Sequence, residues 1–148
     1  MNELKALTCT ATAALLLACG GCGSDESSTT PAPTKDEFIA AANEICGAGD
    51  AEIQQATQQL DSSASDEELE QFVTDTAIPV IEDERDQLDE LGAPEGDEEE
   101  VDAILNGLDD AIAAVKADPG SALSDSGPFD EVNQLAQDYG LTDCGNGA

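Results

Sequence analysis

Residues 94–120 read PEGDEEEVDAILNGLDDAIAAVKADPG and show the clearest periodicity in the chain. The apolar residues recur at spacings of three and four, which places them on one face of an α-helix. Asp118, Pro119 and Gly120 end the pattern, because proline cannot continue a helix and glycine favours a turn. The segment predicts an amphipathic helix that starts near residues 94–97, with an inward face formed by Val101, Ile104, Leu105, Leu108, Ala111, Ile112 and Val115.

Two further helices are predicted upstream, each opened by a capping box in which a hydroxyl residue precedes a Glu by three positions. The first box is Thr34–Glu37 and the second is Ser65–Glu68, with a loop at residues 61–64 between the helices. The first inward face comprises Phe38, Ala42, Ile45, Gly49, Ile53, Ala56 and Leu60. The second comprises Leu69, Phe72, Val73, Thr76, Val80, Ile81, Leu88 and Leu91.

Pro79 interrupts the second helix, since it removes a backbone donor and biases Ile78 away from the α region. We therefore expect a kink there, or two short helices in series. Gly92, followed by Pro94, is a plausible end to this helix.

A last helix is predicted from Pro128, and Gly140-Leu141 suits a Schellman ending. Its expected inward residues are Phe129, Val132, Leu135, Ala136 and Tyr139. No segment alternates β-branched and polar residues, so the fold class is all-α. Short loops between amphipathic helices favour a small antiparallel four-helix bundle.

The charge of the chain excludes several functions. The 148 residues include 34 Asp and Glu against 4 Lys and Arg, a net charge of −30. Binding to nucleic acid or to anionic lipid through basic side chains is excluded, because both need clustered Lys or Arg. The chain has no His, which removes Ser–His and Cys–His nucleophiles. We predict a protein that is not an enzyme and needs no cofactor.

Residues 1–18 have the character of an export signal. Residues 6–18 are uncharged and mostly apolar, and at ~1.5 Å per residue they are too short to span a bilayer core of ~30 Å as a helix. The run ends Leu16-Leu17-Ala18-Cys19-Gly20, which resembles the lipobox of bacterial lipoproteins. The resemblance implies cleavage after Ala18 and diacylglyceryl transfer to Cys19. The alternative is an ordinary secretory signal in which Cys19 is incidental.

Residues 19–33 are small, polar and Pro-containing, which is typical of a flexible, disordered tether. Cys22 lies within it and forms a C-x-x-C spacing with Cys19. A redox motif would need a strand-to-helix setting and a zinc site a second ligand pair, and neither is present. The predicted organisation is therefore a signal at 1–18, a tether at 19–33 and an acidic helical domain at 34–148.

Cys46 and Cys144 lie near the two ends of the predicted domain. In an exported chain this arrangement favours a disulfide that fastens the C-terminal tail to the first helix. The alternative is a pair of buried or free thiols. Together with Asn43-Glu44-Ile45-Cys46, the ending Tyr139-Gly140-Leu141-Thr142-Asp143-Cys144 resembles small, helical, cysteine-bridged actinobacterial lipoproteins. That family has no established activity, so the resemblance implies no catalytic residue.

Acidic residues concentrate between Glu82 and Asp102, where 12 of 21 residues are Asp or Glu and Arg85 is the only basic one. Like charges at i, i+4 destabilise a helix, and a Ca²⁺-type ion would relieve the repulsion through carboxylate oxygens. No EF-hand pattern is present, and a solvated acidic face is the simpler interpretation. The candidate metal ligands are Glu82, Asp86, Asp89, Glu90, Asp97 and Glu98.

The sequence thus predicts a lipoprotein on the outer, extracytoplasmic face of the cell membrane, attached through lipid at Cys19. Its expected function is that of an accessory or interaction module with a basic protein partner. The alternatives are a divalent-cation-binding surface protein and, less favoured, an envelope enzyme. The acidity itself suits either a high-salt environment or a protein kept soluble beside an anionic envelope.

Overall fold

The computed structural model describes residues 31–124 and 126–144. The predicted signal at 1–18, with Cys19, Cys22 and the tether up to residue 30, lies outside the described residues. The described part is all-α, as predicted. Its elements are α1 (Lys35–Thr57), α2 (Asp66–Phe72), the π-helical η1 (Val73–Ala77), α3 (Ile78–Leu91), α4 (Glu98–Ala117), the 3₁₀-helical η2 (Pro119–Leu123) and α5 (Asp130–Tyr139).

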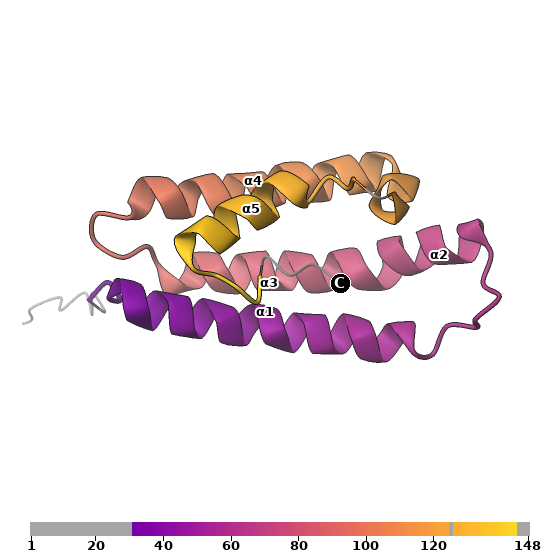
Figure 1. Ribbon diagram of the computed structural model, residues 1–148, viewed down its shortest axis with the longest axis horizontal. Helices are drawn as coiled ribbons and strands as arrows, with labels where there is room; N and C mark the ends of the chain where they lie inside the picture. The colour runs from indigo at the N-terminus through magenta and orange to yellow at the C-terminus, as the bar shows by residue number, and fades with distance from the viewer. Residues whose placement is uncertain (1–30, 125, 145–148) are drawn as a thin grey trace, which may run out of the picture. The chain divides into compact units, whose positions relative to one another are not determined.

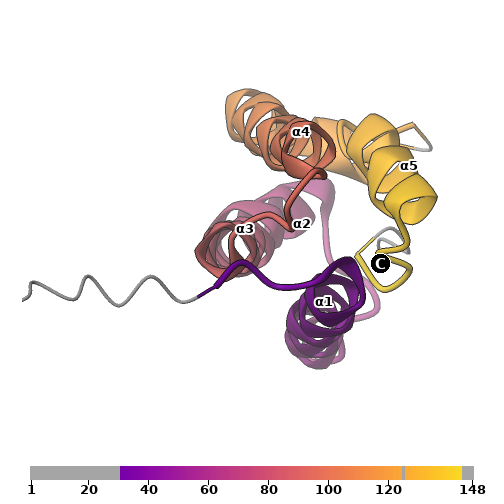
Figure 2. The ribbon, with the colours of Figure 1, turned by 90° about the vertical axis from the view of Figure 1, so that its left-hand side faces the viewer.

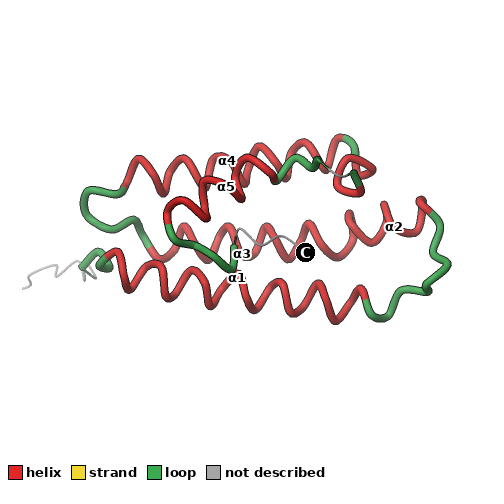
Figure 3. Tube along the Cα trace, in the orientation of Figure 1, coloured by secondary structure: helices red, strands yellow, loops and turns green. Residues whose placement is uncertain are grey.

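The helices form an antiparallel bundle in which α1, the continuous run from α2 to α3, α4 and α5 alternate in direction (Figure 1). α1 packs on α3, α3 packs on α4, and α5 folds back along α4. Seen along the bundle, α1, α3, α4 and α5 surround a common interior (Figure 2). Figure 3 shows helices, loops and turns, and no strand, within the described residues. The predicted four-helix bundle is confirmed.

Both predicted capping boxes are present. Thr34 Oγ1 accepts a hydrogen bond from the Glu37 backbone N–H, and the Glu37 carboxylate accepts one from the Thr34 N–H at 2.9 Å. Ser65 and Glu68 repeat the arrangement, with the Ser65 N–H donating to Glu68 at 2.8 Å. Each box satisfies two backbone donors that a helix start leaves free, which is why α1 and α2 begin where they do.

Pro79 interrupts the second helix as predicted, because α2 and α3 are two helices in series, joined through η1. Ile78 keeps helical angles (φ −61°, ψ −45°), so the expectation that it would leave the α region is wrong. The backbone instead widens into η1, where the Ile78 N–H donates to the Val73 carbonyl. A π-turn of this kind is a usual solution where the i→i−4 ladder is broken. α2 and α3 are thus in series without a loop, and Ile78 is buried in the core.

Two clusters of buried side chains form the core. The larger joins α1, α3, α4 and α5 through residues that include Phe38, Leu88 and Leu105, and the smaller joins η1, α3 and α4 around Ile78 and Val115. The prediction fails at Leu135, whose side chain is 40% exposed. α5 begins at Asp130, two residues after Pro128, and buries Val132, Ala136 and Tyr139, which were expected to face inward.

Candidate functional site

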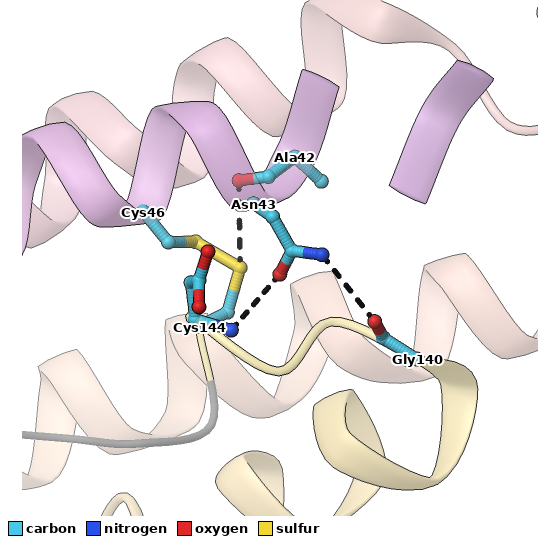
Figure 4. Close-up of a disulfide and its surroundings, with 6 residues drawn as sticks. Ala42, Asn43, Cys46, Gly140 and Cys144 are labelled. Atoms are coloured by element: carbon cyan, nitrogen blue, oxygen red, sulfur yellow. Dashed lines mark hydrogen bonds between the residues drawn. A yellow bond between two sulfur atoms is a disulfide. The ribbon is translucent and has the colours of Figure 1, made fainter. Parts of the chain in front are cut away.

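The C-terminal end of the domain is fastened to α1 by a disulfide between Cys46 and Cys144, as predicted. The two Cα atoms lie 4.9 Å apart, and 98 positions separate the residues in sequence. Figure 4 shows the bond bridging α1 and the segment that follows α5. Cys144 Sγ also lies 3.6 Å from the carbonyl oxygen of Ala42, so the sulfur packs closely along the helix backbone.

Asn43 holds the same segment through its side-chain amide. Its Nδ2 donates to the Gly140 carbonyl at 3.4 Å, and its Oδ1 accepts from the Asp143 N–H at 2.9 Å (Figure 4). The amide therefore satisfies backbone groups at both ends of the turn that leads to the disulfide.

Asp97 connects the starts of α1 and α4 with the end of α5. Its carboxylate accepts a hydrogen bond from the Tyr139 hydroxyl at 2.8 Å and pairs with Lys35 at 3.1 Å. The Lys35 ammonium lies 3.9 Å from the centre of the Tyr139 ring, a cation–π contact. The hydrogen bonds from Tyr139 and Lys35, with the charge of Lys35, lower the pKa of Asp97 below its usual value. Burial and the bond to Asp97 raise the pKa of Tyr139.

The predicted metal ligands are spread over α3, the α3–α4 turn and the start of α4, and most of them are bound by basic side chains or the backbone. Asp86 and Asp89 pair with Arg85, which also donates to Asp109 on α4 at 3.1 Å. Glu82 pairs with Lys116 across the two helices. Asp97 is engaged as described above.

The remaining two candidates, Glu90 and Glu98, have exposed side chains. Glu98 accepts a hydrogen bond from the Gly96 N–H at 2.9 Å. Among the described residues, no group of three or more His, Cys, Asp or Glu side chains could hold a metal ion. The structure does not bring the six candidates together into a coordination site.

The described residues form a partly open cavity between α1, α3 and the segment that joins α4 to α5. Its volume is about 470 Å³. Apolar side chains from several elements line it, among them Ile53, Phe72, Ile81, Leu108 and Phe129. Asp50, Glu84 and Asp130 contribute carboxylates, and none of the described lining residues is Lys or Arg. Its volume lies within the range of roughly 300–1,000 Å³ that is usual for small-molecule sites.

Glu84 is the most unusual of these acids. Its Oε1 atom is buried and has no hydrogen-bond partner among the described residues. The carboxylate lies against α1 where residue 49 is a glycine, and a Cβ atom there would overlap it. Burial, and then the charges of Asp50 and Asp83, raise the pKa of Glu84 to about 7. Asp50 has its pKa raised by burial and by Asp143.

The sequence analysis did not single out Asp50 or Glu84, although a signal was present. Glu84 is three residues after Ile81 and four before Leu88, so helical spacing puts it on the inward face of α3. Asp50 is likewise four residues after Cys46 and three before Ile53. An acidic residue on the apolar face of a helix indicates a buried polar group. In a chain with 34 acids, this position alone did not make Asp50 or Glu84 stand out.

In the described part of the chain, no helix is both long enough and apolar enough to cross a membrane. Comparison of the chain with protein-family models, with curated proteins and with solved structures gave no match.

Proposed function

We propose that the protein is an extracytoplasmic lipoprotein whose helical bundle is a non-enzymatic binding or accessory module. A lipid on Cys19 would hold it on the outer face of the cell membrane, and residues 19–33 would link the anchor to the bundle. A diacylglyceryl group brings two acyl chains, which is what stable anchoring requires.

The observation that carries the proposal is the Cys46–Cys144 disulfide. Structural disulfides form and persist in oxidising compartments outside the cytoplasm. Export through a signal that ends in Leu16-Leu17-Ala18-Cys19 explains both the oxidised pair and the anchor. The disulfide supports export, and the cysteine at the end of the signal supports lipid attachment.

The acidic surface suggests how the module is used. An anionic membrane repels a protein of net charge −30, which favours a bundle held away from the lipid surface. The same charge attracts a basic partner and speeds its approach. We propose that the partner docks on the acidic α3–α4 turn.

Cell fractionation tests the anchor. Cys19→Ser is expected to move the protein from the membrane fraction to the medium or periplasm, and Cys22→Ser is the matched control that should stay in the membrane. Mass spectrometry of the mature N-terminus should find the lipid on residue 19. Membrane retention of the Cys19→Ser protein would contradict the anchor.

Cross-linking on intact cells tests the docking surface. Replacement of the exposed Glu98, Glu99 and Glu100 by Gln is expected to weaken capture of a basic partner, and more so at low salt. The same number of Glu→Gln changes at Glu44, Glu52 and Glu67, which are also exposed, is the charge-matched control. Equal loss in both variants would argue against the α3–α4 turn as the docking site.

A further inference from the structure

We propose that the cavity between α1, α3 and the α4–α5 connection binds a small organic cation with an apolar body, such as an alkylammonium ion. The charged nitrogen would lie between Asp50 and Glu84, and the apolar body would lie against Ile53, Ile81 and Phe129. This site is distinct from the proposed lipid anchor and from the acidic α3–α4 turn.

The size and lining of the cavity fit such a ligand. Its volume of about 470 Å³ lies within the range of roughly 300–1,000 Å³ that is usual for small-molecule sites. Most of the lining is apolar, with a few polar groups that could orient a ligand, including Thr57, Ser124 and Asn133. An apolar occupant would remove this apolar lining from contact with solvent, which is favourable.

The negative charge of the lining favours a positively charged ligand. Asp50, Glu84 and Asp130 all line the cavity, without a Lys or Arg among the described lining residues. Each Lys and Arg of the described chain is engaged with acids outside the cavity: Lys35 with Asp97, Arg85 with Asp86, Asp89 and Asp109, and Lys116 with Glu82. A carboxylate or phosphate ligand would therefore meet like charges and no counter-charge.

The state of Glu84 argues for a cation rather than a neutral ligand. A buried polar atom without a hydrogen-bond partner costs free energy, and Glu84 Oε1 is such an atom. An ammonium group in the cavity would offset the repulsion between the carboxylates of Glu84 and Asp50, which both line it. Burial and the charges of Asp50 and Asp83 hold the pKa of Glu84 near 7, so binding should strengthen as the pH rises through neutrality and the carboxylate ionises.

The walls of the cavity are held in place by contacts far apart in sequence. Cys144 lines the cavity and is bonded to Cys46 on α1. Gly49 allows the Glu84 side chain to reach the α1 backbone. A site fixed in this way before binding loses little conformational entropy when a ligand enters.

Calorimetry on the full chain carrying Cys19→Ser tests the proposal, since no acyl chain at position 19 can then enter the cavity. The probes are n-octylammonium, n-octanol and octanoate, which share one chain length, and ethylammonium, which has the charge without the apolar body. We expect n-octylammonium to bind one per protein at pH 8 and fixed ionic strength. n-Octanol should bind at least about tenfold more weakly, as the loss of one charge-assisted hydrogen bond implies, and octanoate and ethylammonium should not bind measurably.

Variants locate the site. Glu84→Gln should weaken n-octylammonium binding about tenfold or more, and Ala122→Leu should abolish it by filling the space that Ala122 lines. Glu90→Gln makes the same change of charge on the exposed face of α3 and should leave the affinity within about twofold. If Ala122→Leu fails to fold, the difference in n-octylammonium affinity between Glu84→Gln and Glu90→Gln still tests whether the ligand binds in the cavity.

Three results would overturn the proposal. Equal binding of n-octanol and n-octylammonium would show that the positive charge of the ligand does not contribute to its affinity. Equal weakening by Glu84→Gln and Glu90→Gln would show that the cation is held by the general surface charge. No binding of n-octylammonium to the Cys19→Ser chain would mean that the cavity holds water only.

Discussion

The environment of the Glu84 carboxylate on α3 depends on a small residue of α1, Gly49. The carboxylate can lie against α1 only because residue 49 has no side chain. Gly47, two positions earlier on the same helix, has open space where its Cβ would be. Alanine at either position would raise the helix propensity of α1, but only at position 49 would its Cβ also collide with the Glu84 carboxylate. A comparison of the two substitutions therefore isolates the steric effect.

Gly49→Ala should displace the Glu84 side chain toward solvent. The pKa of Glu84 is then expected to fall from about 7 toward its ordinary value of 4.5, because burial is the main cause of its elevation. Carbon-detected NMR titration of the side-chain carboxyl measures this directly. Gly47→Ala is the control: it should raise the free energy of unfolding by up to about 1 kcal/mol and leave the titration of Glu84 unchanged. A Glu84 pKa that stays near 7 in Gly49→Ala would refute the steric argument.

Glu84 should also make stability depend on pH. Its pKa is about 7 in the folded protein against an ordinary 4.5, so between these values the folded state binds more protons than the unfolded state. The free energy of unfolding therefore falls as the pH rises from about 4.5 to 7, and above pH 7 the full penalty applies. Asp50, which faces Glu84 from α1, has a raised pKa and contributes with the same sign.

Glu84→Gln should remove this penalty. We expect the variant to be more stable than the parent by about 1–2 kcal/mol at pH 8, after allowance for the partial exposure of the carboxylate, and nearly equal to it at pH 4.5. Urea unfolding at the two pH values measures the difference. Glu90→Gln, exposed on the same helix, controls for the lower net charge; if it gains as much, the pH effect belongs to the whole surface.

At the level of the helix, α5 shows how a local ending positions a long-range contact. Gly140 has φ +114°, the Gly140 N–H donates to Gln137 O at 3.1 Å, and the Leu141 N–H donates to Ala136 O at 2.8 Å. This is the predicted Schellman ending. It turns the chain back toward α1 and buries Leu141, which is 1% exposed.

Gly140→Ala should destabilise the bundle. An alanine at a left-handed position costs roughly 1–2 kcal/mol, and its Cβ would also lie 3.1 Å from Ile39 Cδ1. Thermal and urea unfolding should both record the loss. Gly127→Ala, where the Cβ would meet nothing within 4 Å, should be close to neutral, and similar losses in both variants would exclude the backbone conformation as the cause.

For the whole molecule, the disulfide is a covalent cross-link between two segments that are far apart in the described chain. It closes a loop across 98 positions, for which the chain-entropy model gives about 4–5 kcal/mol. Cys46→Ala/Cys144→Ala is expected to lose about 2–5 kcal/mol of unfolding free energy. Chemical denaturation of this variant, compared with the parent before and after reduction, measures the contribution. A reduced parent as stable as the oxidised one would show that Asn43 and Leu141 suffice to hold the tail.

Salt should stabilise the protein. Acids exceed basic residues by 30 in net charge, and the described Lys and Arg residues form only a few exposed pairs. Screening therefore removes more repulsion than attraction as the Debye length falls from ~10 Å at 0.1 M salt to ~3 Å at 1 M. The melting temperature should rise with NaCl and level off; a chain unfolded in dilute buffer would favour the high-salt interpretation of the acidity.

Local sequence was enough to predict the helices and their ends. The capping boxes at Thr34 and Ser65, the turn at Gly92 and the Schellman ending at Gly140 each depend on residues within a few positions, where propensity and hydrogen bonding act directly. The inward faces of α1 and α4 followed from the 3.6-residue period. The pairing of Cys46 with Cys144 followed from the small number of cysteines.

The tertiary structure decided what depends on neighbours from other helices. Ile78 remains helical and buried because the π-helical η1 absorbs the effect of Pro79, and Leu135 is exposed because α5 is set by its packing on α4. The cavity and the environment of Glu84 need α1, α3 and the α4–α5 connection together. Periodicity gives the direction of a side chain, but burial, unpaired atoms and raised pKa values arise only when several segments meet around it.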